Sequence, residues 1–247
     1  MPVTLCVANQ KGGVGKTTTA TCLAHALALT GRQILVIDVD PQANATSGMG
    51  LAPVPASPAF AGAAADGVVA TAWSGVWAIP AGRDLERLAV RGVASALVLR
   101  ANIERMPTPQ FAAILIDCPP SLGMITQNAL AAAQGVIVPI QCEYYPLEGL
   151  VQLLSAVRQA TQTNPGLSVA GVLLTMFDPA ADLSREVETE VRTKLKEPVF
   201  RTVIPRDSAV AEAPSHCLSV LDYAPRSPGA KAYGELALEM LQMGLVK

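Results

Sequence analysis

The stretch that decides the fold is residues 3–19, which read VTLCVANQKGGVGKTTT. Its first part, Val3 to Ala8, is almost wholly apolar and predicts a strand buried on both faces. A glycine-rich turn follows, and from Thr17 the pattern predicts a helix that Gly31 closes. A strand, a glycine-rich turn and a helix in direct succession are what a phosphate-binding loop requires.

The residue types in this turn suit a nucleotide triphosphate. Gly12, Gly13 and Gly15 carry no Cβ, so the main chain can approach phosphate oxygens, and the N–H groups at the helix start form an anion cradle. Lys16 supplies a point charge for the β- and γ-phosphates, and the Thr17 hydroxyl is suited to Mg²⁺. We therefore expect a phosphate site that also holds magnesium.

The turn departs from the ordinary pattern G-x-x-x-x-G-K-[ST] at two positions. Gln10 stands where that pattern has glycine, and Lys11 is an additional cation. A second cation is redundant if the protomer works alone. Lys11 has a use if it crosses a two-fold interface and neutralises charge on the partner's nucleotide as the γ-phosphate leaves. The alternative is a solvated loop lysine.

Two further predicted strands end in carboxylates. Residues 34–42 read ILVIDVDPQ, and residues 114–120 read ILIDCPP. Buried strand ends rarely hold unpaired charge, and hydrated magnesium would give these carboxylates a partner. Asp117 fits a magnesium-associated acid. Asp38 and Asp40 fall on one face, so spacing leaves open which of them polarises water, and a cap or turn role remains open for Asp38.

Strand and helix patterns alternate along the chain. This predicts a single α/β domain over residues 1–247, with a doubly wound, mostly parallel sheet, helices on both faces and ligands at the strands' carboxyl ends, as in P-loop proteins. The 247 residues are 51% hydrophobic and 15% charged, enough for a large core. The expected strands are 3–8, 34–39, 113–116, 135–140 and 169–174, and the expected helices are 17–30, 122–133, 147–161 and 183–196.

Residues 48–82 interrupt the alternation with an excursion rich in Ala, Pro and Gly. The segment holds a single charge, Asp66, and both tryptophans, Trp73 and Trp77. We interpret it as a long surface excursion that packs loosely on the sheet edge. The alternative is a partner or dimer surface anchored by the two tryptophans.

Charge and cysteine usage limit the possible partners and compartments. A net charge of −2 excludes a protein that wraps nucleic acid by bulk charge, so any DNA contact needs a local patch. Five scattered cysteines without a C-x-x-C, beside two histidines, argue against a zinc site or disulfide framework and favour a reducing cytoplasm. The sequence shows neither a signal peptide nor the roughly 18 uninterrupted apolar residues of a membrane span.

These motifs together resemble the ParA/Soj-type partition ATPases, the P-loop branch with a deviant Walker A motif. The resemblance extends through QNAL at 127–130, PIQCEYYPLEG at 139–149, IPR at 204–206 and EAPS at 212–215. It implies an ATP-dependent sandwich homodimer with weak ATPase activity that requires Mg²⁺. It also implies non-specific binding to double-stranded DNA, association with the nucleoid, and a ParB-type partner that stimulates hydrolysis.

The resemblance assigns roles to individual residues. Lys11 matches the signature lysine that acts in trans, and Lys16 matches the phosphate lysine. Asp40 matches the aspartate that orients the attacking water, and Asp117 matches the Walker B acid. The implied magnesium ligands are Thr17, Asp40 and Asp117. The implied ATP-binding residues are Lys11, Gly12, Gly13, Val14, Gly15, Lys16, Thr17, Thr18, Met176 and Pro205, the last two beside the adenine ring.

The basic face of the family is thinned in this chain. Ala209 stands where the family often has a DNA-contacting arginine, and Leu218 and Pro228 stand where basic residues are common. DNA binding is therefore expected to be weaker, with a shallower salt dependence. The candidate contacts are Arg192, Lys194, Lys196, Arg201, Arg206, Arg226 and Lys231. A stripe of Arg83, Arg87 and Arg91 is either a solvated helix face or a further contact.

Three other functions share these motifs. A membrane-directed positioning ATPase would end in a basic amphipathic helix, whereas residues 233–247 hold two acids and one lysine and suit a core-covering helix. A nucleotide-dependent ligase or an iron–sulfur reductase is a metabolic alternative; the reductase would need Cys118 and Cys142 as ligands, although their apolar neighbours favour core packing. A ParA-like ATPase that positions a protein cargo has the same motifs.

Overall fold

The computed structural model describes residues 2–62, 64–93, 95–107, 110–143 and 147–247. Strands and helices alternate as the sequence predicts, and each expected strand and helix is present with its ends shifted by a few residues. The strands are β1 (Val3–Val7), β2 (Ile34–Asp38), β3 (Val69–Ala70), β4 (Val76–Ile79), β5 (Ala113–Asp117), β6 (Gly135–Gln141), β7 (Ser168–Phe177) and β8 (Val199–Pro205).

Helices connect and cover these strands. The longer ones are α1 (Lys16–Ala28), α5 (Met124–Ala132), α6 (Leu147–Ala160), α7 (Asp182–Lys194) and α10 (Pro228–Gln242). The shorter ones are α2 (Asn44–Gly48), α3 (Leu85–Arg91), α4 (Val98–Arg105), α8 (Ser208–Glu212), the 3₁₀ helix η1 (Ala213–His216) and α9 (Val220–Tyr223).

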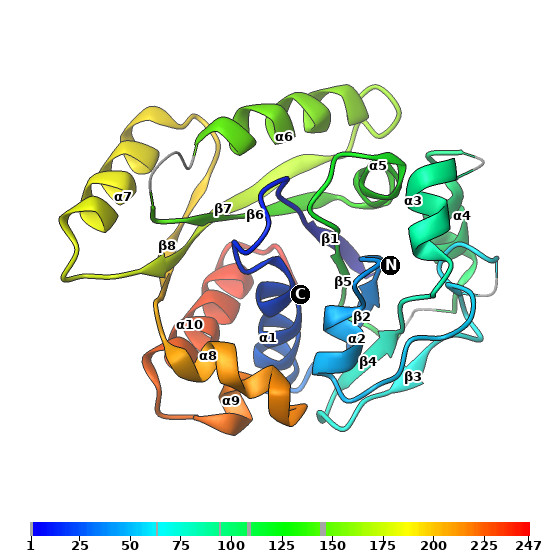
Figure 1. Cartoon of the computed structure of the whole chain (residues 1–247), viewed down its shortest axis with the longest axis horizontal. Helices are drawn as coiled ribbons and strands as arrows, with labels where there is room; N and C mark the ends of the chain where they lie inside the picture. Colours follow the sequence, from blue (N-terminus) through cyan, green and yellow to red (C-terminus); the bar gives the residue numbers. More distant parts are fainter. Residues whose placement is uncertain (1, 63, 94, 108–109, 144–146) are drawn as a thin grey trace.

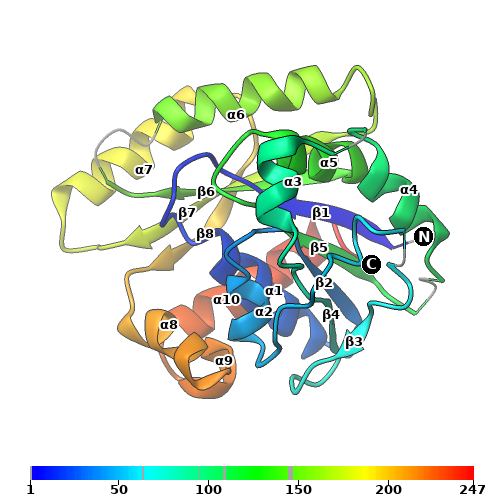
Figure 2. The ribbon, with the colours of Figure 1, turned by 45° about the vertical axis from the view of Figure 1, so that its right-hand side comes forward.

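All eight strands form one sheet in the order β3-β4-β2-β5-β1-β6-β7-β8. Every neighbouring pair is parallel except β3 with β4. Figures 1 and 2 show α5, α6 and α7 on one face of the sheet, and α1 and α10 on the other. The predicted doubly wound, mostly parallel α/β fold is confirmed.

The core lies in two layers, one on each side of the sheet. Along β2, Leu35 and Ile37 face the layer shared with α5, whereas Ile34 and Val36 face the layer shared with α1 and α10. This period of two, with apolar residues on both sides, is why the central strands read as continuous apolar runs. The carboxyl ends of β1, β2 and β5 meet at one edge, where Asp38 and Asp117 are paired in register.

The segment 48–82 contributes to the sheet as well as to the surface. Strand β4 pairs with β2. The Trp73 side chain is buried, stacks on His25 and donates from Nε1 to the Cys217 carbonyl at 2.9 Å. The half-buried Trp77 donates from Nε1 to Gln33 Oε1 at 2.8 Å. Both indole N–H groups therefore have partners within the chain.

Helix α10 covers the core. Tyr233, Leu236 and Met240 on this helix are buried against α1 and β8. Within the described ranges, no helix is both long enough and apolar enough to span a bilayer.

Candidate functional site: a phosphate loop with a nucleoside cavity

The glycine-rich turn lies between β1 and α1, at the carboxyl edge of the sheet. Gly13 and Gly15 adopt φ values of 75° and 86°, a left-handed conformation that side chains with a Cβ rarely adopt. Gly15 directly precedes helix α1, so the N–H groups of the first helical turn face the loop. Local glycine chemistry thus forms the anion cradle that the sequence predicts.

Two residues that the sequence analysis missed hold this loop in shape. Asn9 donates from Nδ2 to the Pro139 carbonyl at 2.7 Å and accepts from the Lys11 N–H at 3.0 Å. Thr175 donates from Oγ1 to the Val14 carbonyl at 3.0 Å. Both lie at the carboxyl side of strands β1 and β7, and that position is the signal that could have identified them.

The two lysines of the loop occupy opposite environments. Lys16 is buried, and its Nζ donates to the Lys11 carbonyl at 2.9 Å. Burial lowers the pKa of Lys16, while the nearby Asp117 and Asp40 carboxylates act to raise it. The side chain of Lys11, by contrast, is exposed to solvent. The Lys16 ammonium therefore lies within its own loop, whereas the Lys11 side chain is accessible to another molecule.

Asp117 ends β5 inside the protein. Its side chain is fully buried, and among the described residues neither carboxylate oxygen has a hydrogen-bond partner. Burial and the nearby Asp38 carboxylate raise the pKa of Asp117 well above its ordinary value, with Thr17 and Lys16 acting in the opposite direction. A buried carboxylate without a donor beside the Thr17 hydroxyl fits a hydrated magnesium ion, which prefers oxygen ligands.

The structure gives Asp38 and Asp40 different surroundings. Asp38 accepts hydrogen bonds from the Asp40 N–H and from both the N–H and the hydroxyl of Thr46, at 3.1, 2.8 and 2.7 Å. Burial nevertheless raises the pKa of Asp38 to about 6. The Asp40 carboxylate accepts only the N–H of Gln42, at 2.9 Å, among the bonds of the described chain. Asp40 retains acceptor capacity for a ligand, whereas Asp38 holds the loop together.

A cavity of about 370 Å³ adjoins the phosphate loop. Gly15 and Thr18 line one end, and Met176 and Pro205 lie on its walls, so the two expected adenine-side residues are brought together at the ends of β7 and β8. The sequence analysis assigned none of the other lining residues to a nucleotide site: β8 was not among the expected strands, Arg206 was expected to contact DNA, and Thr175 and Tyr233 come from β7 and α10. These include Thr175, Ile204, Arg206, Asp207, Ser208 and Tyr233.

Asp207 fixes one wall of this cavity. Its carboxylate accepts from the Ala209 N–H at the start of α8, at 3.0 Å, and from the Gly229 N–H, at 2.9 Å. Burial raises the pKa of Asp207, but the hydrogen bonds it accepts prevail, so the net shift is downward. Arg206, also on the wall, pairs with Glu143 at 2.6 Å. The neighbouring residues 144–146 of the PIQCEYYPLEG motif lie outside the described residues.

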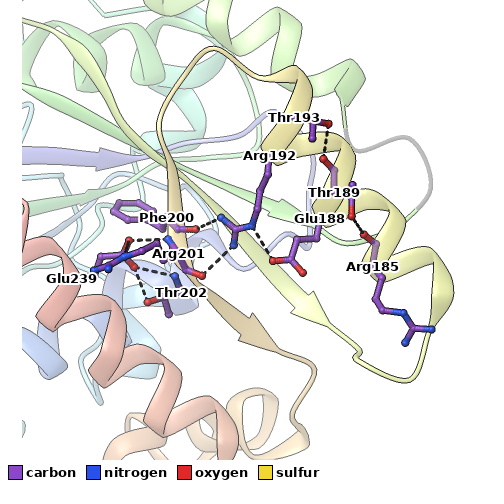
Figure 3. A network of polar contacts seen from close by, with 9 residues as sticks. All are labelled: Arg185, Glu188, Thr189, Arg192, Thr193, Phe200, Arg201, Thr202 and Glu239. Carbon is purple, nitrogen blue, oxygen red and sulfur yellow. Dashed lines mark hydrogen bonds and ion pairs between the residues drawn. The ribbon is translucent and has the colours of Figure 1, made fainter.

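The structure separates the candidate DNA contacts into three groups: one bonded to the main chain of β8, three without an ion pair among the described residues, and the rest paired with acidic side chains. Arg192 donates from Nε to Glu188, from Nη1 to the Phe200 carbonyl and from Nη2 to the Arg201 carbonyl, at 2.9, 2.9 and 3.1 Å (Figure 3). Its guanidinium is thus bonded to α7 and β8, which leaves it fewer donors for DNA than the exposed candidates have. Three exposed candidates have no ion pair within the described part of the chain, namely Lys196, Arg226 and Lys231.

The remaining candidates are partly neutralised by neighbours. Lys194 pairs with Glu190 at 2.7 Å, and Arg201 lies 3.5 Å from Glu239. In the proposed stripe, Arg87 and Arg91 lie on α3, but Arg83 precedes the helix; all three side chains are exposed.

Both cysteines considered for an iron–sulfur cluster are buried. Cys118 and Cys142 belong to the hydrophobic layer beneath α5 and α6. The neighbouring Cys6 thiol and burial raise the pKa of Cys118, and burial raises the pKa of Cys142 to about 12. Their place in this layer agrees with the core packing that their apolar neighbours in the sequence predict.

Comparisons with known proteins agree with this site. A family described as an AAA domain matches residues 3–169. The chain is 44% identical to the chromosome-partitioning ATPase Soj of Thermus thermophilus, over 96% of this chain and 94% of that protein. It is 40% identical to the sporulation initiation inhibitor protein Soj of Bacillus subtilis, over 97% and 98% of the two chains.

Among solved structures, a similar one is described as cobyrinic acid a,c-diamide synthase from Mycobacterium smegmatis with bound ADP and magnesium. The TM-score is 0.83 and the identity 34%, covering 99% of this chain and 97% of that one. Identity over nearly the full length is thus higher to the Soj proteins than to this structure. With the deviant phosphate loop and the paired carboxylates in place, this chain belongs to the ParA/Soj family of partition ATPases.

Proposed function

We propose that this chain hydrolyses ATP and acts as a dimerising DNA-partition ATPase. In its ATP state two copies bind double-stranded DNA without sequence specificity, and a ParB-type partner stimulates a weak intrinsic hydrolysis. The cycle segregates a chromosome or plasmid in the cytoplasm, on the nucleoid. The whole chain, residues 1–247, serves as one ATPase domain.

The geometry supports a division of labour at the ATP site. The adenosine would occupy the cavity beside Met176 and Pro205, and the phosphates would lie on the glycine-rich loop. Lys16 would neutralise phosphate charge, and Thr17 and Asp117 would hold magnesium, directly or through its water shell. Magnesium would supply charge neutralisation at the β- and γ-phosphates. Asp40 would orient the attacking water and contribute to the magnesium shell.

The observation that carries the proposal is the contrast between the two loop lysines. Lys16 is buried and bonded to its own loop, whereas Lys11 extends its ammonium into solvent from the same turn. The main chain of Lys11 is held by Asn9 and Lys16, whereas its ammonium has no hydrogen bond to any of the described residues. A free cation at the edge of a phosphate site suits a second nucleotide on a facing copy, where it would stabilise the leaving phosphate charge.

The relatives support the partition function more closely than the alternatives. Proteins described as Soj and as ParA are 40–44% identical to this chain over nearly all of it. The same ATP switch could instead position a protein cargo, or act at a membrane, because the identity of the cargo depends on the partner. The synthase structure with bound ADP and magnesium supports the same nucleotide and metal.

Mass measurement by light scattering tests the proposal. With ADP we expect a monomer; with a non-hydrolysable ATP analogue and Mg²⁺ we expect a dimer, which elutes with DNA at low salt. A monomer under both nucleotides would contradict the dimer, and no retention on DNA at low salt would contradict the partition role. Flotation with liposomes in the ATP state would instead support the membrane-directed alternative.

A further inference from the structure

A buried chain of hydrogen bonds links the site to a distant loop. Thr46, in α2, is fully buried. Its hydroxyl donates to Asp38 Oδ2 at 2.7 Å and accepts from the Ala81 N–H at 2.9 Å. Its own N–H donates to the same carboxylate oxygen at 2.8 Å. The Thr46 hydroxyl thus joins the end of β2 to the segment that follows β4.

The same carboxylate also holds the main chain of the proposed water-orienting residue. Asp38 Oδ1 accepts from the Asp40 N–H at 3.1 Å. The Asp40 carbonyl in turn accepts from Ala43, whose φ of 55° is left-handed and strained for a residue with a Cβ. The turn that carries Asp40 is therefore fixed from both ends, by Asp38 and by the start of α2.

The far end of this chain is itself firmly anchored. The Ala81 carbonyl accepts from Val54, and Asp84 Oδ1 accepts from the Ser57 N–H at 2.8 Å. At Gly82 an added Cβ would lie 2.0 Å from the Ser57 nitrogen, so the two segments lie in close contact. Thr46 is therefore bonded to two separate parts of the chain, to Asp38 at the end of β2 and to the well-packed segment at Ala81.

Asp38 is committed to these contacts. One oxygen accepts the Asp40 N–H, and the other accepts both donors of Thr46. Both oxygens of this buried carboxylate are thus engaged by donors of the chain itself. The two aspartates at this strand end therefore differ in role. The Asp40 carboxylate is available to a ligand, and the Asp38 carboxylate holds the main chain of Asp40 in place.

We infer that Asp38 and the Thr46 hydroxyl form a positioning pair that sets the orientation of the Asp40 carboxylate for ATP hydrolysis. The inference rests on the proposed function. It makes Thr46, a fully buried residue outside the phosphate loop, a determinant of turnover. A positioning fault lowers the rate of the chemical step while leaving nucleotide binding intact, because the loop and the nucleoside cavity are untouched.

Thr46→Val and Thr46→Ser test the pair. Valine has the shape of threonine without its hydroxyl, so both the bond to Asp38 and the acceptor for Ala81 are lost; serine keeps both. Thr30→Val is the matched control, since the Thr30 hydroxyl donates to the Leu27 carbonyl, remote from the site. Folding is checked by circular dichroism, and kcat, KM and the Kd for Mg²⁺-ADP are measured for each full-length protein.

We expect Thr46→Val to lower kcat about tenfold or more with Kd and KM changed less than about twofold, and Thr46→Ser and Thr30→Val to stay near the parent. Equal turnover in Thr46→Val and the parent would overturn the inference. So would a matching loss of nucleotide affinity, or a Thr46→Ser variant as slow as Thr46→Val.

Asp38→Asn provides an independent second variant, because its amide group cannot accept from all of the same donors. We expect it to lower kcat as Thr46→Val does. If neither variant folds, the pair is structural and the inference fails. If the parent does not hydrolyse ATP, the proposed function itself fails. Loss of hydrolysis in Asp40→Ala, together with normal hydrolysis in a folded Thr46→Val, would reject the positioning pair alone.

Discussion

At the scale of single residues, Lys16 and Asp117 are two buried ionisable groups that lie close to each other at the phosphate loop. Burial shifts the pKa of each toward its neutral form, and each partly offsets the shift of the other. Asp117 accepts no hydrogen bond of ordinary length and angle within the described chain, although the nearby Thr17 hydroxyl acts to lower its pKa. Leaving such a group unsatisfied destabilises a protein by about 1–3 kcal/mol or more. This loss is consistent with a site that a cation completes.

The two loop lysines should respond differently to removal. Lys16→Ala takes away the only lysine or arginine that is buried among the described residues, and with it the charge proposed to neutralise the phosphates, so we expect ATP affinity to fall at least about tenfold. Lys11→Ala should leave affinity within about twofold but reduce hydrolysis about a hundredfold, because its charge acts on the leaving phosphate. Fluorescent-nucleotide titration and phosphate release distinguish the two. Equal effects of both substitutions on affinity would contradict the division of roles.

Asp40→Ala tests the water-orienting residue. The carboxylate accepts one main-chain N–H, so its loss disturbs the fold little. We expect hydrolysis to fall by about a hundredfold or more and ATP to remain bound, so that the dimer persists after ATP is added. Light scattering over time and phosphate release measure both. Hydrolysis at the parent rate would show that another group orients the water.

At the scale of elements, the edge strand β8 is held by side chains from two helices. Arg192 of α7 donates to the Phe200 and Arg201 carbonyls, and Glu239 of α10 accepts from the Arg201 and Thr202 N–H groups at 2.7 and 2.9 Å (Figure 3). The strand's main-chain groups are satisfied where its pairing with β7 is irregular. At residues 200–202 this protection leaves fewer free main-chain groups for another strand to pair with.

Glu239→Gln should weaken this attachment in a pH-dependent way. Burial raises the pKa of Glu239, but the donors of Arg201 and Thr202 prevail, so its folded pKa lies below the ordinary value of 4.5. Its stabilisation is therefore fully present above about pH 4.5 and is lost as the pH falls through the lower folded value. We expect the variant to lose about 1–3 kcal/mol at pH 7 in urea unfolding.

The difference between the parent and Glu239→Gln should shrink as the pH falls below about 4.5, because Glu239 of the parent becomes protonated whereas glutamine is neutral at every pH. Glu235→Gln, on the exposed face of the same helix, is the matched control and should change the free energy of unfolding by less than about 0.5 kcal/mol. A difference for Glu239→Gln that does not depend on pH would contradict this account.

At the scale of the whole molecule, a net charge of −2 leaves DNA binding to a few local cations. Three exposed candidates, Lys196, Arg226 and Lys231, have no ion pair within the described residues, whereas Arg192 is bonded to β8. A dimer doubles the number of such cations, which would explain why the proposed DNA binding depends on ATP.

We therefore expect ATP-dependent DNA binding that survives only at low salt. Lys231→Ala should reduce the slope of log affinity against log salt by about one unit per contact removed. Arg192→Ala should instead lower the free energy of unfolding, with a smaller effect on that slope. Fluorescence anisotropy with random duplex DNA over a salt series measures the slopes. Identical slopes in the parent and in Lys231→Ala would remove that residue from the contacts.

Much of the fold and the core of the site could be predicted from the sequence because their signals are local. The glycines of the phosphate loop and the apolar runs of the strands each determine structure through residues that are close together in the sequence. Short or irregular elements gave weaker signals. Strand β8 has Arg201 and Thr202 in its middle and was missed, because α7 and α10 supply the partners that make those residues acceptable there.

The sequence by itself determined the loop, the parallel sheet and the acids at the strand ends, since each depends on neighbouring residues. Only the tertiary structure decided how Asp38 and Asp40 differ, where β4 pairs, and that Arg192 binds a strand. Each of these depends on which distant group lies within hydrogen-bond distance: Thr46 for Asp38, β2 for β4, and β8 for Arg192. Such pairings arise when the chain folds, and residue spacing carries no signal for them.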